Sequence, residues 1–220
     1  MAYDASWTNI AGAVNVREVY MAYPSFPRQS KFCEYLIEHN KLSAQGFEEW
    51  IFYPGMLFQS PDKWWGNGGY RDRPHEGIDV CLYRDQDGKI CRLDALTKVP
   101  VMYRGSIVSI IDDYTGKTAF VCHDIRDEEG NQLYSIYGHM EPIDSIAMGG
   151  MVDEGRIIGS IADNMKNKEI KMLPHLHLSL AWIPEDFPQE KLRWNTISDS
   201  PGVTLLNPLD VVGCPYTVLE

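Results

Sequence analysis

The stretch HLHLSLAW, residues 175–182, decides the fold class of this chain. Leucines occupy every second position, at 176, 178 and 180, and polar residues occupy the positions between them. Alternation with a period of two is typical of a β-strand whose one face lies in a core. Such a strand sends the leucines to one side and both His175 and His177 to the other.

The shared face of the two histidines indicates a functional cleft. At about 3.3 Å of rise per residue, their Cα atoms would lie about 6.6 Å apart. Both rings can then line one cleft, while only one reaches a metal ion comfortably. Two exposed side chains are an equally good interpretation of the pair alone, because a catalytic zinc site needs three protein ligands from His, Asp or Glu.

From about residue 70 onwards, short apolar or alternating runs are separated by turn signals such as Asp87-Gly88 and Thr115-Gly116. The runs are IDVCLY, KICRL, GSIVSII, TAFVCHDI, QLYSIYGH, RIIGSIA and HLHLSLAW. This spacing favours antiparallel strands. We therefore predict a mainly β domain over residues 61–220, with an antiparallel sheet that forms the floor of the cleft.

Residues 1–60 carry helix signals and are predicted to form a short helical N-terminal extension. Ser30 can cap KFCEYLIEHN, and Ser43 can cap AQGFEEWIF. The segment SPDKWWGNGGYRDRP, residues 60–74, is rich in Gly, Pro and Trp and is predicted to be a loop. Its Trp64 and Trp65 are interpreted either as walls of the cleft or as core or domain-contact residues.

Composition excludes some classes of partner. The formal net charge of −11 argues against a nucleic-acid surface. No apolar stretch approaches the roughly 20 residues of a membrane span, and the start MAYDASWTNIAGAVNV has no basic region typical of a signal peptide. The odd number of cysteines, with no CxxC pair, favours buried free thiols and a reducing compartment, with one disulfide as the alternative. They are Cys33, Cys81, Cys91, Cys122 and Cys214.

Partners for the histidine pair lie in RPHEGIDVCLY, residues 73–83. His75 and Asp79 are four positions apart, which in an extended chain is about 13 Å, too far for an easily shared metal ion. A bend near Gly77 is therefore required if they act together. Glu76 as a general base, or loop and turn roles for His75 and Asp79, are the alternatives.

His139 in YSIYGHMEP ends an alternating run and shares strand parity with Tyr137. A neutral histidine beside a metal site can act as a general base or orient a water molecule, and a protonated one can polarise a carbonyl group. His39 and His123 fall outside this set and are interpreted as structural residues.

Taken in order, HEGID, YGHM and HLH resemble the motifs of the M23 zinc metallopeptidases, the group of lysostaphin and LytM. The resemblance covers about residues 70–215 and includes the segments VPVMYRGSIVSI, VDEGRIIGSI and LLNPLDVV. It implies a zinc ion held by His75, Asp79 and His177, with His139 and His175 as catalytic residues beside it. Tyr70 is a candidate oxyanion donor, as a tyrosine is in some relatives, with packing as the alternative.

The resemblance also implies a function, a zinc-dependent endopeptidase acting on peptidoglycan stem peptides or cross-bridges. A non-catalytic M23-like scaffold that regulates wall hydrolases, and a zinc peptidase with a non-wall peptide substrate, are the alternatives. The segment DNMKNKEIKMLP stands where many members carry a Gly- and Ser-rich turn. The cell envelope or the extracellular space is implied by the family, and the missing export signal leaves the cytoplasm open.

Overall fold

The computed structural model describes residues 27–163 and 172–220, and every structural statement below concerns these residues. The start of the chain, MAYDASWTNIAGAVNV, lies outside them. Most of the segment DNMKNKEIKMLP lies outside them as well.

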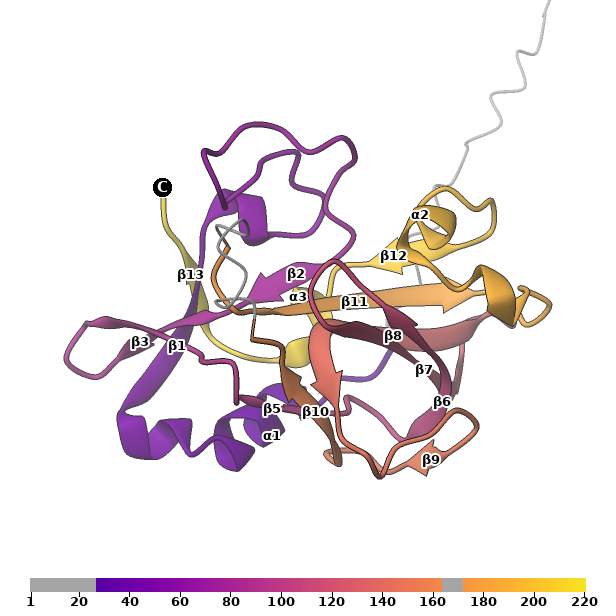
Figure 1. Cartoon of the computed structure of the whole chain (residues 1–220), viewed down its shortest axis with the longest axis horizontal. Helices are drawn as coiled ribbons and strands as arrows, with labels where there is room; N and C mark the ends of the chain where they lie inside the picture. Colours follow the sequence, from indigo (N-terminus) through magenta and orange to yellow (C-terminus); the bar gives the residue numbers. More distant parts are fainter. Residues whose placement is uncertain (1–26, 164–171) are drawn as a thin grey trace, which may run out of the picture.

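Most of the strands form one large antiparallel sheet, which confirms the predicted mainly β fold (Figure 1). Its path runs β12-β11-β8-β7-β6-β9, with β2 paired to β11, β10 paired to β8, and β5 paired to β10. The strands are β2 (Ile78–Val80), β5 (Lys98–Pro100), β6 (Gly105–Asp112), β7 (Lys117–Arg126), β8 (Gln132–Pro142), β9 (Met151–Val152), β10 (Ile157–Ile161), β11 (Leu176–Ile183) and β12 (Thr204–Leu206).

A second, smaller sheet has the strand order β13-β1-β3-β4. Its strands are β1 (Phe47–Phe52), β3 (Leu82–Asp85), β4 (Ile90–Arg92) and β13 (Tyr216–Val218). The pairing of β1 with β13 is parallel, whereas β1 pairs with β3 in the antiparallel sense. The helical pieces are α1 (Phe32–His39), η1 (Leu42–Gln45), η2 (Pro54–Met56), η3 (Gln189–Lys191), α2 (Trp194–Ile197) and α3 (Leu209–Val212).

The alternation in β11 places the leucines on one face in the core, as the sequence predicted, and a second apolar cluster lies on the other face. Leu176, Leu178 and Leu180 are fully buried in the larger cluster, where each contributes about 1.5–3 kcal/mol. Ala181 and Ile183 belong to a smaller cluster that also contains residues of α2 and β7. No helix within the described residues is long and apolar enough to cross a membrane.

The predicted helix at AQGFEEWIF is wrong, because residues 47–52 form β1. A short 3-10 turn ends at Gly46, whose φ of 79° is left-handed and therefore breaks a helix. The aromatic residues that follow become buried, because β1 pairs with β3 on one side and with β13 on the other.

The helix predicted at KFCEYLIEHN is confirmed as α1, and Ser30 Oγ accepts a hydrogen bond from Phe32 N at its start. The domain boundary near residue 60 stays a prediction.

The expectation of free thiols is wrong for two cysteines, because Cys33 of α1 and Cys214 near the C-terminus form a disulfide. Their Cα atoms lie 6.1 Å apart, within the range that a disulfide spans. Cys81, Cys91 and Cys122 are free, as predicted. The bridge closes a loop of 181 positions and ties the first described helix to the strand segment that ends the chain.

Replacing both bridged cysteines, as Cys33→Ser with Cys214→Ser, is expected to lower the free energy of unfolding by about 2–5 kcal/mol, because the unfolded chain loses a long-loop constraint. Serine at position 33 keeps an acceptor for Trp50 Nε1. Thermal unfolding with and without a reducing agent measures the effect, and Cys91→Ser is the control. Equal melting temperatures of the double variant and the oxidised wild type would contradict the bridge.

Candidate metal centre and active site

Strand β11 places His177 between two other strands that supply the site. Its backbone pairs opposite Asp79 of β2 on one side and opposite Gly138 of β8 on the other. His175 lies directly before the first residue of β11. The register of one strand therefore brings HxxxD, YGHM and HxH together, although they lie far apart in the sequence.

The predicted bend near Gly77 is confirmed, since the chain bends at Glu76 and Gly77 before β2 begins. As a result His75 Nε2 lies 3.1 Å from Asp79 Oδ1. A Cβ atom at Gly77 would lie 2.2 Å from the carbonyl oxygen of Leu178 and 2.3 Å from Ser179 Oγ. Glycine is required here because the bent segment approaches the backbone of β11 too closely for any side chain.

His75, Asp79 and His177 form a buried cluster. His75 Nε2 lies 3.1 Å from His177 Nδ1, and His177 Nδ1 lies 3.0 Å from Asp79 Oδ1. One donor atom from each residue lies within 4.8 Å of the others, and all three residues are buried. Two imidazoles and one carboxylate are a donor set that suits zinc.

The ring nitrogen of each histidine that points away from this cluster contacts another protein group. His75 Nδ1 lies 3.1 Å from the carbonyl oxygen of Leu57, so that Nδ1 donates and Nε2 keeps its lone pair. His177 Nε2 lies 3.0 Å from Ser179 Oγ, which leaves Nδ1 for the centre. Three lone pairs thus converge on one point in a buried place, an arrangement that a bound cation stabilises.

Asp79 is held by its second oxygen. Trp64 Nε1 donates to Asp79 Oδ2 over 2.6 Å, and Arg71 Nη2 donates to the same atom over 3.3 Å. Burial opposes ionisation of this carboxyl group, but the nearby imidazoles, first that of His75, outweigh burial and hold its pKa well below the ordinary value. The carboxylate therefore stays charged and presents Oδ1 to the histidines.

His139 and His175 lie beside this cluster. The ring centroids of His139 and His175 are 4.7 Å apart, and those of His139 and His177 are 6.0 Å apart. His175 Nδ1 lies 2.9 Å from the carbonyl oxygen of Leu173, and its Nε2 faces Asp79 Oδ1 at 3.6 Å. Burial lowers the pKa of His175 to about 4, so the ring is neutral near pH 7.

The five residues line or underlie an open cleft of about 330 Å³. Its lining consists of Lys63, Trp65, Arg71, Glu76, Asp79, Asp113, Tyr114, His139, Met172, His175, His177 and Trp194. Tyr70 is 76% exposed and is not among these residues, so its role as an oxyanion donor stays a prediction. Glu76 lines the cleft and accepts a hydrogen bond from Ser198 Oγ.

Several cleft residues were missed or left open by the sequence patterns. Trp64 contacts both Asp79 and the ring of His175, whose centroid lies 5.1 Å from its own, so it supports the site rather than only a core. Trp65 lines the cleft, and the Arg71 guanidinium lies 4.3 Å from the centroid of its ring. Asp113 and Trp194 carried no recognisable signal, because a hairpin turn and a short helix bring them in from unrelated segments.

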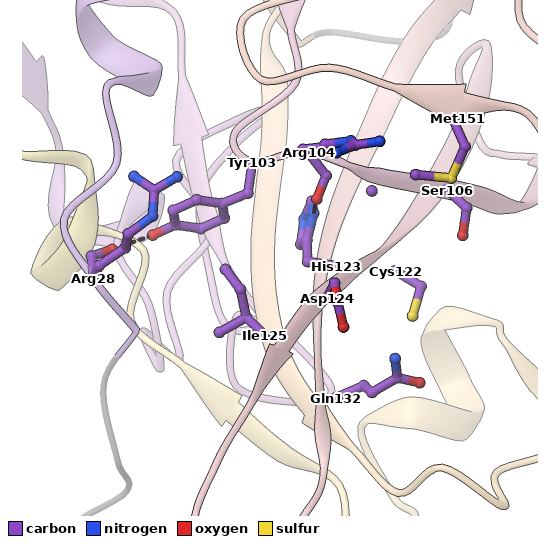
Figure 2. A pocket seen from close by; sticks show the side chains of 11 residues that line it. Arg28, Tyr103, Arg104, Ser106, Cys122, His123, Asp124, Ile125, Gln132 and Met151 are labelled. Atoms are coloured by element: carbon purple, nitrogen blue, oxygen red, sulfur yellow. Dashed lines mark hydrogen bonds between the residues drawn. The ribbon is translucent and has the colours of Figure 1, made fainter.

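A larger cavity of about 580 Å³ lies at the other end of the β6–β7 hairpin (Figure 2). Burial lowers the pKa of its His123 to about 4, and this ring contacts the carbonyl oxygen of Arg104 at 3.1 Å and Ser135 Oγ at 2.7 Å. Both ring nitrogens are therefore used within the protein. His39 contacts the carbonyl oxygen of Gly155, so neither histidine joins the metal cluster. The buried His–Asp–His cluster lies at the smaller cleft.

No protein-family model matches the chain, and no curated protein sequence matches it. Similar solved structures include a mutant catalytic domain of the prophage-encoded M23 protein EnpA of Enterococcus faecalis. Its sequence is 25% identical, the match covers 74% of this chain and 98% of that chain, and the TM-score is 0.36. A Pseudomonas aeruginosa protein assigned as an M23 peptidase has 20% identity, 71% and 58% coverage, and a TM-score of 0.33. A Ruminococcus gnavus protein assigned as a glycyl-glycine endopeptidase LytM has 16% identity, 66% and 51% coverage, and a TM-score of 0.35.

The chain spans little more than half the length of the last two proteins. The first two carry the family name M23, and the third carries the name LytM. In its ordered motifs, its large antiparallel sheet and its buried His–Asp–His cluster, this chain resembles the M23 peptidases.

Proposed function

We propose that this protein is a zinc-dependent endopeptidase. The observation that carries the proposal is the convergence of His75, Asp79 and His177 at the floor of an open cleft, with two further histidines beside them. Structural ion pairs rarely bring four imidazoles and one carboxylate together, and such clusters are typical of functional sites.

In this proposal the metal ligands are His75 Nε2, Asp79 Oδ1 and His177 Nδ1. A zinc ion in such a site lowers the pKa of a bound water molecule to about 7 and polarises the substrate carbonyl group. The outer contacts of the ligands, with Leu57, Ser179 and Trp64, fix which atom of each ligand faces the centre.

His139 and His175 are the proposed catalytic residues. Nδ1 of each ring faces a protein oxygen, on Asp113 for His139 and on Leu173 for His175, so that Nε2 of each ring keeps its lone pair. His175 Nε2 points towards the proposed metal cluster, 3.6 Å from Asp79 Oδ1. Together the two rings would orient the attacking water, accept its proton and stabilise the developing oxyanion. Their neighbouring positions allow a proton taken from the water to be passed on to the leaving amine.

The proposed substrate is a peptide, in peptidoglycan stem peptides or cross-bridges. The cleft is open and has aromatic walls, Trp65, Tyr114 and Trp194, against which an extended peptide can pack. A non-catalytic regulator of wall hydrolases is the second candidate, but it gives no reason for a complete cluster with satisfied outer contacts. A non-wall peptide as the substrate is the third candidate.

The disulfide bears on where the protein works. Disulfides persist in oxidising environments and are rare in the cytosol of most cells. The Cys33–Cys214 bridge therefore favours the cell envelope or the extracellular space over the reducing compartment that the cysteine count had indicated. This location agrees with a cell-wall substrate.

Removal of one proposed ligand is expected to weaken zinc binding strongly. His177→Ala and His75→Ala should each lower zinc affinity by more than about 100-fold, because loss of an outer partner alone costs about 10–100-fold. Titration calorimetry or competition with a chelating dye measures the affinity. His39→Ala, which removes a histidine outside the cluster, serves as the control, and equal affinities in all variants would place the metal elsewhere.

The peptidase activity is tested with purified peptidoglycan and zinc-loaded protein, followed by mass spectrometry of the released fragments. Wild type is expected to release peptide fragments, a chelator to abolish the release and added zinc to restore it. His175→Ala should bind zinc with nearly wild-type affinity but release no fragments. A zinc-replete, folded wild type that cleaves neither peptidoglycan nor isolated cross-bridge peptides would exclude the wall-endopeptidase function.

A further inference from the structure

His139 has an unusual backbone conformation. Its φ of 59° is left-handed, which among the described residues other than glycine is shared only with Lys41 and Gln59. Such a conformation costs of order 1–3 kcal/mol and persists only where the surrounding structure enforces it. Ala162 N donates to the carbonyl oxygen of His139 over 2.8 Å and helps to hold this conformation.

The conformation marks a β-bulge that turns His139 out of the core. Lys117 pairs with Met140 and Ala119 pairs with Tyr137, so β8 contains one residue more than β7 over this interval. Tyr137 and Met140 both lie in the larger apolar cluster, although they are three positions apart. The parity predicted for His139 and Tyr137 is therefore broken at the bulge, and His139 joins the face of His175 and His177.

The carboxylate of Asp113 lies next to the turned-out ring. Asp113 follows β6 in the hairpin turn, and its Oδ2 lies 3.2 Å from His139 Nδ1, with 9% and 17% of the two side chains exposed. Nδ1 is fully buried and has no well-aligned hydrogen-bond partner. The two atoms lie within hydrogen-bond distance, and catalytic hydrogen bonds are often poorly aligned before substrate binds.

Asp113 is itself held by donors on both oxygens. Thr118 Oγ1 donates to Oδ2 over 2.6 Å, and the backbone N–H of Tyr114 donates to Oδ1 over 2.6 Å. These donors and the His139 ring outweigh burial and keep the pKa of Asp113 below its ordinary value. The side chain is thus an ionised acceptor with a fixed orientation.

A second contact links this carboxylate to the proposed metal centre. Trp194 Nε1 donates to Thr118 Oγ1 over 3.1 Å, and the Trp194 ring packs on the ring of His177 with 4.6 Å between centroids. Gly138 makes room for this convergence, because a Cβ atom there would lie 3.2 Å from Trp194 Cζ2 and 3.4 Å from Asp113 Oδ2. The hydrogen bonds run from Trp194 through Thr118 to Asp113, whose Oδ2 lies 3.2 Å from His139 Nδ1.

We propose that Asp113 is a positioning residue, which holds the His139 ring as the Nδ1–H tautomer with Nε2 directed to the cleft. Thr118 and Trp194 keep the carboxylate in place. The ring orientation follows from the contacts alone, whereas its catalytic importance rests on the proposed peptidase function.

The test compares zinc-loaded wild type with Asp113→Asn, which has the same shape but offers an amide group to Nδ1. Asp112→Asn is the matched control, because Asp112 is the preceding residue, its side chain is 90% exposed and it pairs with Lys117 on the surface. Ring nitrogen spectra of ¹⁵N-labelled protein report the tautomer of His139. We expect the Nδ1–H form in wild type and Asp112→Asn, and a shift towards the Nε2–H form in Asp113→Asn.

Kinetics provide the second measurement. Asp113→Asn should lower kcat by about 10- to 100-fold. KM and zinc affinity should change by less than about threefold, because the ligands are untouched and asparagine keeps the shape of the cleft lining at this position. Thr118→Val, which removes the donor that fixes Asp113, should give a smaller loss of kcat. If Asp113→Asn fails to fold, the tautomer and kcat of Thr118→Val decide the question.

The outcomes separate the two proposals. An unchanged His139 tautomer in Asp113→Asn overturns the positioning role, whatever the activity. A changed tautomer with unchanged kcat also overturns it, because the orientation would then have no catalytic effect. A wild type that shows the expected tautomer but hydrolyses no peptide contradicts the peptidase function and leaves the structural role of Asp113 supported.

Discussion

The site depends on the register of β11. In this strand His177 pairs opposite Asp79 on one side and opposite Gly138 on the other. A slip of one residue would turn the leucines at 176, 178 and 180 out of the core and both histidines into it. The apolar face of β11 therefore fixes which face the histidines occupy, because burial of three leucines penalises every register shifted by one residue.

A polar cluster buried beside an apolar core is costly unless each polar atom has a partner. Here the outer atoms of the cluster have partners: the Leu57 carbonyl for His75, Ser179 for His177, and Trp64 with Arg71 for Asp79. Their inner atoms face one another at 3.0–3.1 Å. The lone pairs on the inner atoms of the cluster thus point to a single place, where a bound cation can interact with all of them.

The parts of the fold that follow from local pattern could be predicted from the sequence. The strand at residues 175–182 followed from the alternation of leucine and polar residues. The bend at Gly77 followed from the short distance that His75 and Asp79 need to bind one metal ion. The strand at residues 47–52 could not be predicted, because its partners β3 and β13 are distant and a helix is locally plausible. The Cys33–Cys214 pairing was hidden for the same reason, since a cysteine count does not show which residues meet. The strand parity predicted for His139 was wrong, because a bulge of one residue leaves no clear sign in the sequence.

The five residues of the proposed site are therefore fixed in two different ways. His75, Asp79 and His177 are placed by backbone features, the bend at Gly77 and the strand pairing of β2 with β11. His139 is placed by a strained bulge, and its ring is held mainly by side chains from another hairpin, Asp113 and Thr118. Metal binding is consequently tied to the stability of the sheet, whereas the orientation of His139 depends on a few contacts that can change while the fold stays the same. Related sequences can therefore differ in reactivity at equal stability through the residues that hold His139, Asp113 and Thr118, rather than through the metal ligands.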